Sequence, residues 1–184
     1  MNIVCYYTPE YAKEAKLLKE TMDIVGLDTS HVQQRDSLGS WEKNCQYKAI
    51  YILEKLEELN EPVIWVDADA RIMKRPRLFE DLGDTDLAAY WGRWLMSGTL
   101  YLGNTDNAKS LLHQWIDVQK NPANLEWDQK VLQQIIDQFE GTLRTVKLPV
   151  EYCQKFDDRN YPLESAVILH TQASRRLKET IKKE

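Results

Sequence analysis

At 184 residues the chain has room for one domain, and we expect a single domain over residues 1–184. Its hydrophobic content of 43% and charged content of 29% are typical of a soluble globular protein. The net charge of −5 argues against general affinity for nucleic acid, and no apolar run approaches the roughly 20 residues of a membrane helix.

Strands and helices alternate in the predicted chain order. Residues 2–7 form a short apolar run rich in β-formers, and residues 11–25 carry apolar side chains at helical spacing before Gly26. Residues 31–40 are polar and irregular and predict a loop. A second helix is expected over residues 47–59, and the fully apolar residues 63–66 predict a buried strand.

The later part of the chain continues this alternation. Asn104-Thr105-Asp106 predicts the cap of a third helix, and Pro122 with Asn124 introduces a fourth. Further strands are expected at residues 86–91, 99–102, 143–148 and 166–169. The pattern predicts an α/β sandwich with a mostly parallel central sheet.

The cysteines and the N-terminus bear on the compartment. Cys5, Cys45 and Cys153 are widely spaced and form no Cys-x-x-Cys pair, so they predict reduced structural thiols rather than zinc or disulfide chemistry. The N-terminus lacks the basic start, apolar run and cleavage site of a signal peptide. We therefore expect a cytoplasmic protein.

The strongest chemical signal follows the apolar strand at residues 63–66. Asp67 and Asp69 come directly after it, separated by the small Ala68. Ligands of α/β sheets bind beyond the carboxyl ends of the strands, and carboxylates there suit Mg²⁺ or Mn²⁺ together with substrate phosphates. The pair alone is also consistent with an ordinary acidic turn. A phosphatase motif is excluded, because Arg71 stands where that motif has Thr or Val.

A series of short motifs surrounds this acidic pair in a specific order. They are Gly39-Ser40-Trp41, Asn44 and Lys48 before it, and Arg75-Pro76, Ser97-Gly98-Thr99, Asn104-Thr105, Trp127-Asp128-Gln129, Ile168-Leu169-His170 and Ser174-Arg175-Arg176 after it. Over nearly the whole chain this order resembles the nucleotide-diphospho-sugar transferases of GT-A fold, especially their small bacterial and phage members. The resemblance implies a minimal, Rossmann-like three-layer sandwich.

The resemblance also implies a cation site. Asp67 and Asp69 match the Asp-x-Asp motif of the family, with Asp69 favoured as the direct ligand, and His170 matches its third metal ligand. A neutral imidazole suits Mn²⁺ better than Mg²⁺, so manganese is expected and magnesium is the alternative. Without the resemblance, His170 is a lone histidine at the end of a strand.

A nucleotide-sugar site is implied at the matching positions. Asp128 and Gln129 match the catalytic pair that faces the donor sugar, although Asp128 is also consistent with an acid at a helix N-terminus. Ser97-Gly98 matches the loop beside the sugar, or forms a simple hairpin turn. The other expected donor contacts are Tyr6, Tyr7, Thr8, Lys48, Ala68, Arg175 and Arg176, where the tyrosines are also consistent with core positions and the cations with the surface.

The resemblance implies a metal-dependent hexosyltransferase. It would move a hexose from a nucleoside-diphosphate sugar, such as UDP-glucose or UDP-galactose, to an unknown acceptor hydroxyl, with retention favoured and Asp128 as the base if the enzyme inverts. Because the chain is short, the acceptor is expected to be small, recognised through a partner protein, or replaced by water. The alternatives are a non-catalytic nucleotide-sugar or carbohydrate-binding domain and a nucleotidyltransferase-like phosphotransfer enzyme, although no Gly-rich phosphate loop follows the first strand.

Overall fold

A mixed sheet of six strands lies at the centre of the protein, in a computed structural model that describes residues 1–121, 126 and 128–181. The strand order is β2-β1-β3-β6-β5-β7, and β6 runs antiparallel to both of its neighbours while the other pairs are parallel. The strands span Asn2–Tyr7 (β1), Val32–Gln34 (β2), Val63–Val66 (β3), Leu87–Trp91 (β5), Leu95–Leu102 (β6) and Thr145–Lys147 (β7). The predicted mostly parallel sheet is confirmed.

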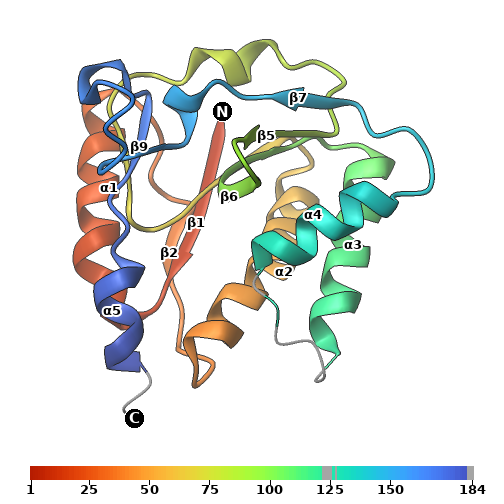
Figure 1. Ribbon diagram of the computed structural model, residues 1–184, viewed down its shortest axis with the longest axis horizontal. Helices are drawn as coiled ribbons and strands as arrows, with labels where there is room; N and C mark the ends of the chain where they lie inside the picture. The colour runs from red at the N-terminus through yellow and green to blue at the C-terminus, as the bar shows by residue number, and fades with distance from the viewer. Residues whose placement is uncertain (122–125, 127, 182–184) are drawn as a thin grey trace.

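Helices cover both faces of this sheet and complete the predicted α/β sandwich (Figure 1). On one face, Leu18 and Met22 of α1 pack in a core with Ile3 and Ile64 of the sheet. On the other face, α2, α3 and α4 enclose a second core around the fully buried Trp115. The α-helices span Ala12–Ile24 (α1), Trp41–Leu59 (α2), Asp106–Lys120 (α3), Asp128–Gln138 (α4) and Ser174–Ile181 (α5), and short 3-10 turns occupy Pro9–Tyr11, Arg77–Asp81, Val150–Tyr152 and Leu163–Ser165.

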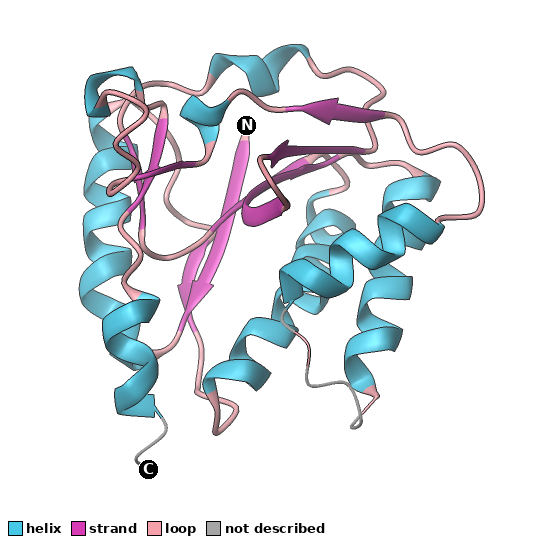
Figure 2. Cartoon of the chain, in the orientation of Figure 1, coloured by secondary structure: helices cyan, strands magenta, loops and turns pink. Residues whose placement is uncertain are grey.

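A small second sheet stands beside α1 (Figure 2). Its strand order is β4-β9-β8, with bounds Ala70–Ile72 (β4), Ile168–His170 (β9) and Gln154–Lys155 (β8). The strand expected at residues 166–169 is therefore present as β9, but it pairs antiparallel with β4 rather than joining the main sheet. In this pairing His170 lies opposite Ala70, next to the end of β3 and about a hundred residues away in sequence.

Several predicted boundaries need correction. The expected loop at residues 31–40 contains β2, which pairs with the outer edge of β1. The sequence does not reveal this strand, because three residues at a sheet edge show no detectable alternation of apolar and polar side chains. The second helix begins at Trp41 rather than Tyr47, because Ser40 caps it by accepting a hydrogen bond from the Lys43 amide at 3.1 Å. The expected start of the fourth helix at Pro122 and Asn124 lies outside the described residues.

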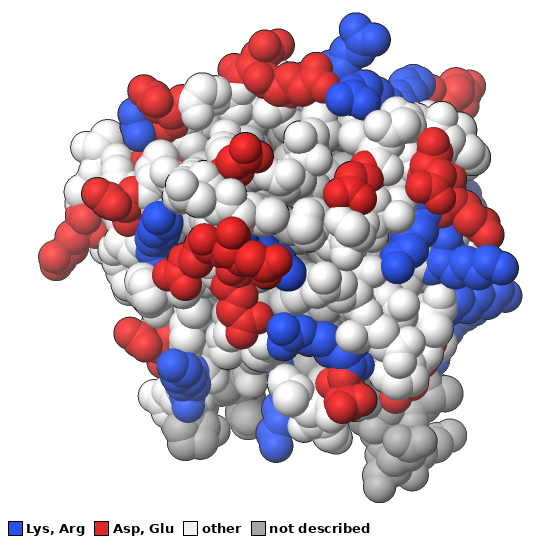
Figure 3. All heavy atoms as spheres, turned by 180° about the vertical axis from the view of Figure 1, so that it is seen from behind, with Lys and Arg blue, Asp and Glu red and all other residues white. Residues whose placement is uncertain are grey.

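The surface carries charges of both signs. On the face seen in Figure 3, the described acidic and basic side chains lie in small interspersed groups rather than in one broad basic field. None of the described helices combines the length and the apolar character needed to cross a lipid bilayer.

Asp86, directly before β5, links the main sheet to the start of α3 through hydrogen bonds. Its side chain is fully buried and accepts hydrogen bonds from Thr105 Oγ1 at 2.6 Å, from the Arg144 amide at 2.7 Å and from Asn107 Nδ2 at 3.3 Å. Thr105 in turn caps α3 through the Ala108 amide. Burial raises the pKa of the Asp86 carboxyl, but the hydrogen bonds outweigh burial and hold the pKa below its usual range.

Replacing Asp86 by asparagine is expected to lower the free energy of unfolding by about 2–3 kcal/mol at pH 7, because buried donors lose a charged acceptor. The folded pKa lies below the unfolded one, so the contribution of the carboxylate is complete above the unfolded pKa and is lost as pH falls through the folded pKa. Urea unfolding should therefore show the two proteins converging at acidic pH. Asp84→Asn is the matched control, since Asp84 also pairs with Arg144 but its side chain is 89% exposed. Equal losses in the two variants would contradict the role of Asp86.

Candidate functional site

One open cavity of about 410 Å³ lies where β3 ends and β6 begins, against α2, α4 and the small sheet. Four of its side chains come from four different elements: Lys48 from α2, Asp67 from the end of β3, Asp128 from the first turn of α4, and His170 from the end of β9. The lining also includes Tyr6, Thr8, Ala68, Asp69, Ser97, Gly98 and Gln129. Residues separated by more than 160 positions therefore share one cavity.

Three potential cation ligands meet in this cavity, and we call Asp67, Asp69 and His170 the cation set. Each offers one ligand atom, and these atoms lie within 4.8 Å of one another. His170 Nδ1 is 3.6 Å from Asp69 Oδ1, while Asp69 Oδ2 accepts a hydrogen bond from the Ala173 amide at 2.7 Å. Two carboxylates and an imidazole are a donor set that fits Mn²⁺ and accommodates Mg²⁺ less well.

Gly98 leaves the space in front of the cation set open. A Cβ atom at this position would lie 2.9 Å from His170 Cε1, 3.2 Å from His170 Nδ1 and 3.3 Å from Asp67 Oδ2. A side chain here would therefore fill the space toward which the imidazole nitrogen and the carboxylate point. The chain has the residue that this geometry needs, which supports the fit of the cation set to a metal ion.

Lys48 links the cation set to Asp128. Its Nζ lies 2.6 Å from Asp128 Oδ2 and 3.1 Å from Asp67 Oδ1, and it donates to the Ser97 carbonyl at 3.2 Å. Ser97 Oγ donates to the same Asp128 oxygen at 3.1 Å, and Trp65 Nε1 donates to Asp67 Oδ1 at 2.8 Å. Lys48, Asp128 and Ser97 are all buried, so these contacts fix the carboxylates in place.

The cavity shifts the pKa values of its charged groups. Burial lowers the pKa of the Lys48 ammonium, but Asp128 and Asp67 outweigh burial and raise it, so Lys48 is charged. Burial raises the pKa of Asp69, but His170 and the Ala173 amide lower it below the usual range. Burial lowers the pKa of His170, whereas Cys153 and Asp69 raise it to about 10. A cation that binds His170 must therefore displace a proton.

The structure brings most of the predicted site residues to the cavity. Tyr6 lines it but also packs edge-on against Tyr47 and Tyr51, with ring centroids 5.5 and 5.2 Å away, so it is partly a core residue. Thr8, directly after the end of β1, also lines the cavity and is buried.

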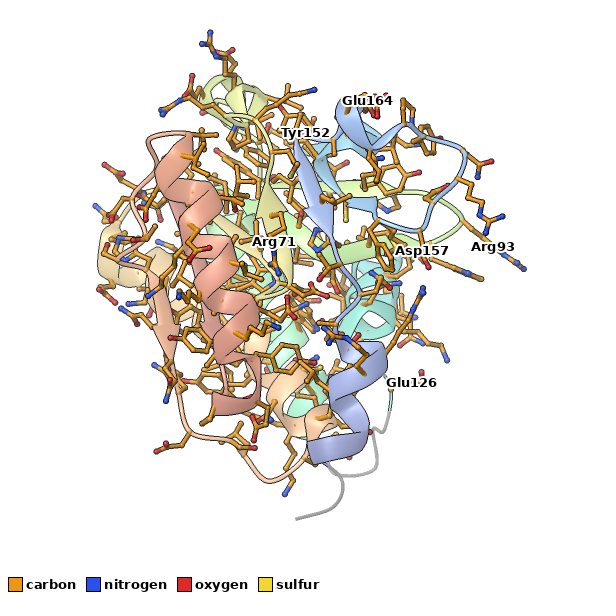
Figure 4. The ribbon with its side chains drawn as sticks, turned by 90° about the vertical axis from the view of Figure 1, so that its left-hand side faces the viewer. Arg71, Arg93, Glu126, Tyr152, Asp157 and Glu164 are labelled. Atoms are coloured by element: carbon orange, nitrogen blue, oxygen red, sulfur yellow. The ribbon has the colours of Figure 1, made fainter. Side chains whose placement is uncertain are left out.

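Three predicted donor contacts lie elsewhere in the described chain. Tyr7 packs with the core under α1. Arg175 pairs with Asp157 at 2.5 Å, and Arg176 pairs with Glu14 at 3.0 Å. Arg71 joins the second of these pairs, since it also contacts Glu14 from β4, and Figure 4 shows it beside α1. Both predicted arginines are therefore paired with carboxylates outside the cavity lining.

Several cavity residues have no clear signal in the sequence. Met96 lies on β6 two residues before Gly98, and Trp94 lies just before the start of β6, where it is 63% exposed at the rim. Lys155 enters from β8. Cys45 and Cys153, which we expected to be purely structural, also line the cavity as free thiols.

The chain has the GT-A fold, as comparison with solved structures shows. A glycosyltransferase involved in the glycosylation of the major capsid of PBCV-1 superposes with a TM-score of 0.70 and 16% identity, covering 97% of this chain and 98% of that one. GlyE of Streptococcus pneumoniae TIGR4 gives 0.67 and 18%, covering 98% of this chain, which spans 58% of GlyE. The galactosyltransferase LgtC, in complex with donor and acceptor sugar analogs, gives 0.56 and 12%, covering 98% and 95%. No protein-family model and no curated protein matches the sequence.

Proposed function

We propose that this protein is a metal-dependent glycosyltransferase that moves a hexose from a nucleoside-diphosphate sugar to an acceptor hydroxyl. The observation that carries the proposal is the cation set, which lies in a cavity at the carboxyl end of β3 in a GT-A fold. Ligands of open α/β sheets bind at this edge. Glycosyltransferase structures of the same fold support the reaction class.

The charges of the cavity favour a donor that arrives with a cation. Asp67, Asp69 and Asp128 face Lys48 and His170 as their nearest cationic partners, so the centre of the cavity has no surplus of positive charge to hold a diphosphate. A divalent cation held by the cation set supplies the charge that balances the leaving nucleoside diphosphate. We infer manganese from the imidazole ligand and a UDP-hexose from the resemblance of the motifs.

The residues of the chain hold the donor sugar between two walls. Ser97 and Gly98 form the wall on β6, where the absence of a side chain at Gly98 permits close approach. Asp128 and Gln129 form the wall on α4, where Lys48 Nζ lies 2.6 Å from Asp128 Oδ2. Tyr6, Thr8 and Ala68 line the inner part of the cavity, where we place the nucleoside.

The contacts of Asp128 favour retention of configuration. An inverting enzyme needs a carboxylate free to take the acceptor proton. Asp128 Oδ2 already accepts from Lys48 at 2.6 Å and from Ser97 at 3.1 Å. With Oδ2 already occupied by these two donors, Asp128 is suited to position hydroxyl groups of the sugar rather than to serve as the base.

The acceptor enters from the rim that Trp94, Met96 and Lys155 form. The three offer an aromatic face, a thioether and an ammonium group rather than a deep pocket. A small acceptor, water, or an acceptor held by a partner protein fits such an open rim. Donor hydrolysis is therefore the activity to look for first.

A turnover assay with Mn²⁺ and a panel of nucleotide sugars tests the proposal. We expect UDP release from UDP-glucose or UDP-galactose, its loss on adding EDTA, and its return with excess Mn²⁺. Proton NMR of the released sugar gives the configuration. Pyrophosphate release would instead indicate phosphotransfer, and tight donor binding without any product would indicate a non-catalytic binding domain.

A further inference from the structure

Thr99 lies behind the cation set rather than in it. It follows Gly98 on β6, pairs with Val66 of β3, and is fully buried. Its Oγ1 is 2.9 Å from His170 Nε2. Since His170 belongs to β9, this contact joins a strand of the main sheet to a strand of the small sheet.

The two nitrogens of the His170 ring face different groups. Nδ1 points toward Asp69 Oδ1, 3.6 Å away, and toward the open space in front of Gly98. Nε2 points away from this space and toward Thr99. A histidine binds a metal through a bare nitrogen, and the partner of the other nitrogen decides which one carries the proton.

We propose that Thr99 is a positioning residue for the cation site: its hydroxyl oxygen accepts a hydrogen bond from His170 Nε2–H and so leaves Nδ1 for the cation. The inference rests on the cation set described under the proposed function. Thr99 is suited to this role because β6 is held by hydrogen bonds to both β3 and β5, so its side chain has little freedom. The backbone of His170 is held in turn by the pairing of β9 with β4, which limits the movement of the imidazole ring.

A matched pair of variants separates this role from simple packing. Thr99→Val removes the acceptor and keeps the branched shape, whereas Thr99→Ser keeps the hydroxyl. Each protein is titrated with MnCl₂ alone, free Mn²⁺ is followed by electron paramagnetic resonance, and folding is checked by a thermal melt without metal. We expect the dissociation constant for Mn²⁺ to rise about 10–100-fold in Thr99→Val, the range typical of losing such an orienting partner, and Thr99→Ser to stay near wild type.

A double-mutant cycle with His170→Ala tests whether Thr99 acts through the imidazole. If it does, Thr99→Val changes Mn²⁺ affinity in the wild-type background but causes no further loss when His170 is already alanine. A Thr99→Val protein that melts earlier yet binds Mn²⁺ as tightly as wild type would overturn the positioning role and leave the cation site standing. Wild-type protein that binds no Mn²⁺ would overturn the cation site and the role of Thr99 together.

Discussion

Replacing Asp69 by asparagine is expected to abolish the Mn²⁺-dependent binding of UDP-glucose or UDP-galactose. Asp69 is buried, and its Oδ1 lies 3.6 Å from His170 Nδ1 within the cation set. The amide keeps the size of the side chain but removes the charge that a divalent cation needs. Loss of an orienting partner alone typically costs about 10–100-fold in metal affinity, so loss of a ligand should cost at least about 100-fold. Calorimetric titration with the donor, in the presence and absence of Mn²⁺, measures the loss of binding.

Asp157→Asn is the matched control for this experiment. Asp157 is an acid near the same cavity, but it pairs with Arg175 and its side chain is 37% exposed. The control should bind donor and Mn²⁺ as wild type does. Asp69→Asn protein that is folded and still binds the donor with unchanged Mn²⁺ dependence would remove the Asp-x-Asp assignment.

Local patterns in the sequence were sufficient to predict the central part of the fold. The apolar residues Val63–Val66 form a buried strand, and such a strand in an α/β chain places the following carboxylates at the ligand-binding edge. Thr105 caps α3 because its hydroxyl oxygen can accept from the Ala108 amide, a contact within one turn. These features depend on neighbours in sequence, which is why the sequence reveals them.

Only one strand of the small sheet could be predicted from the sequence. β9 was expected at residues 166–169, whereas β4 and β8 have three and two residues, too few for any alternation to be detected. The pairing of β4 with β9 joins segments about a hundred residues apart, and nothing local specifies it. His170 was therefore predicted through the resemblance of motifs, while the reason it reaches Asp69, its place opposite Ala70, needed the structure.

The ion pair of Lys48 was also missed, although α2 holds a signal for it. Asn44, Lys48 and Lys55 are spaced by four and seven residues, so they share the helix face that also buries Ile52 and Leu56. A lysine on an apolar face needs a partner when it is buried. The sequence does not say which carboxylate that partner is, because Asp67 and Asp128 come from β3 and α4.

Replacing Lys48 by methionine is expected to lower the free energy of unfolding by about 3–5 kcal/mol, because it leaves the buried carboxylate of Asp128 without its cation. Lys48 side-chain exposure is 7%, and that of its partner Asp128 is 10%. Lys55→Met is the matched control on the same helix: Lys55 is also 7% exposed, but its partner Glu58 is 56% exposed and regains water. Urea unfolding followed by tryptophan fluorescence should show a much smaller loss for Lys55→Met. If the two variants lose equal free energy of unfolding, Lys48 contributes through the burial of its aliphatic stem rather than through its charge between Asp67 and Asp128.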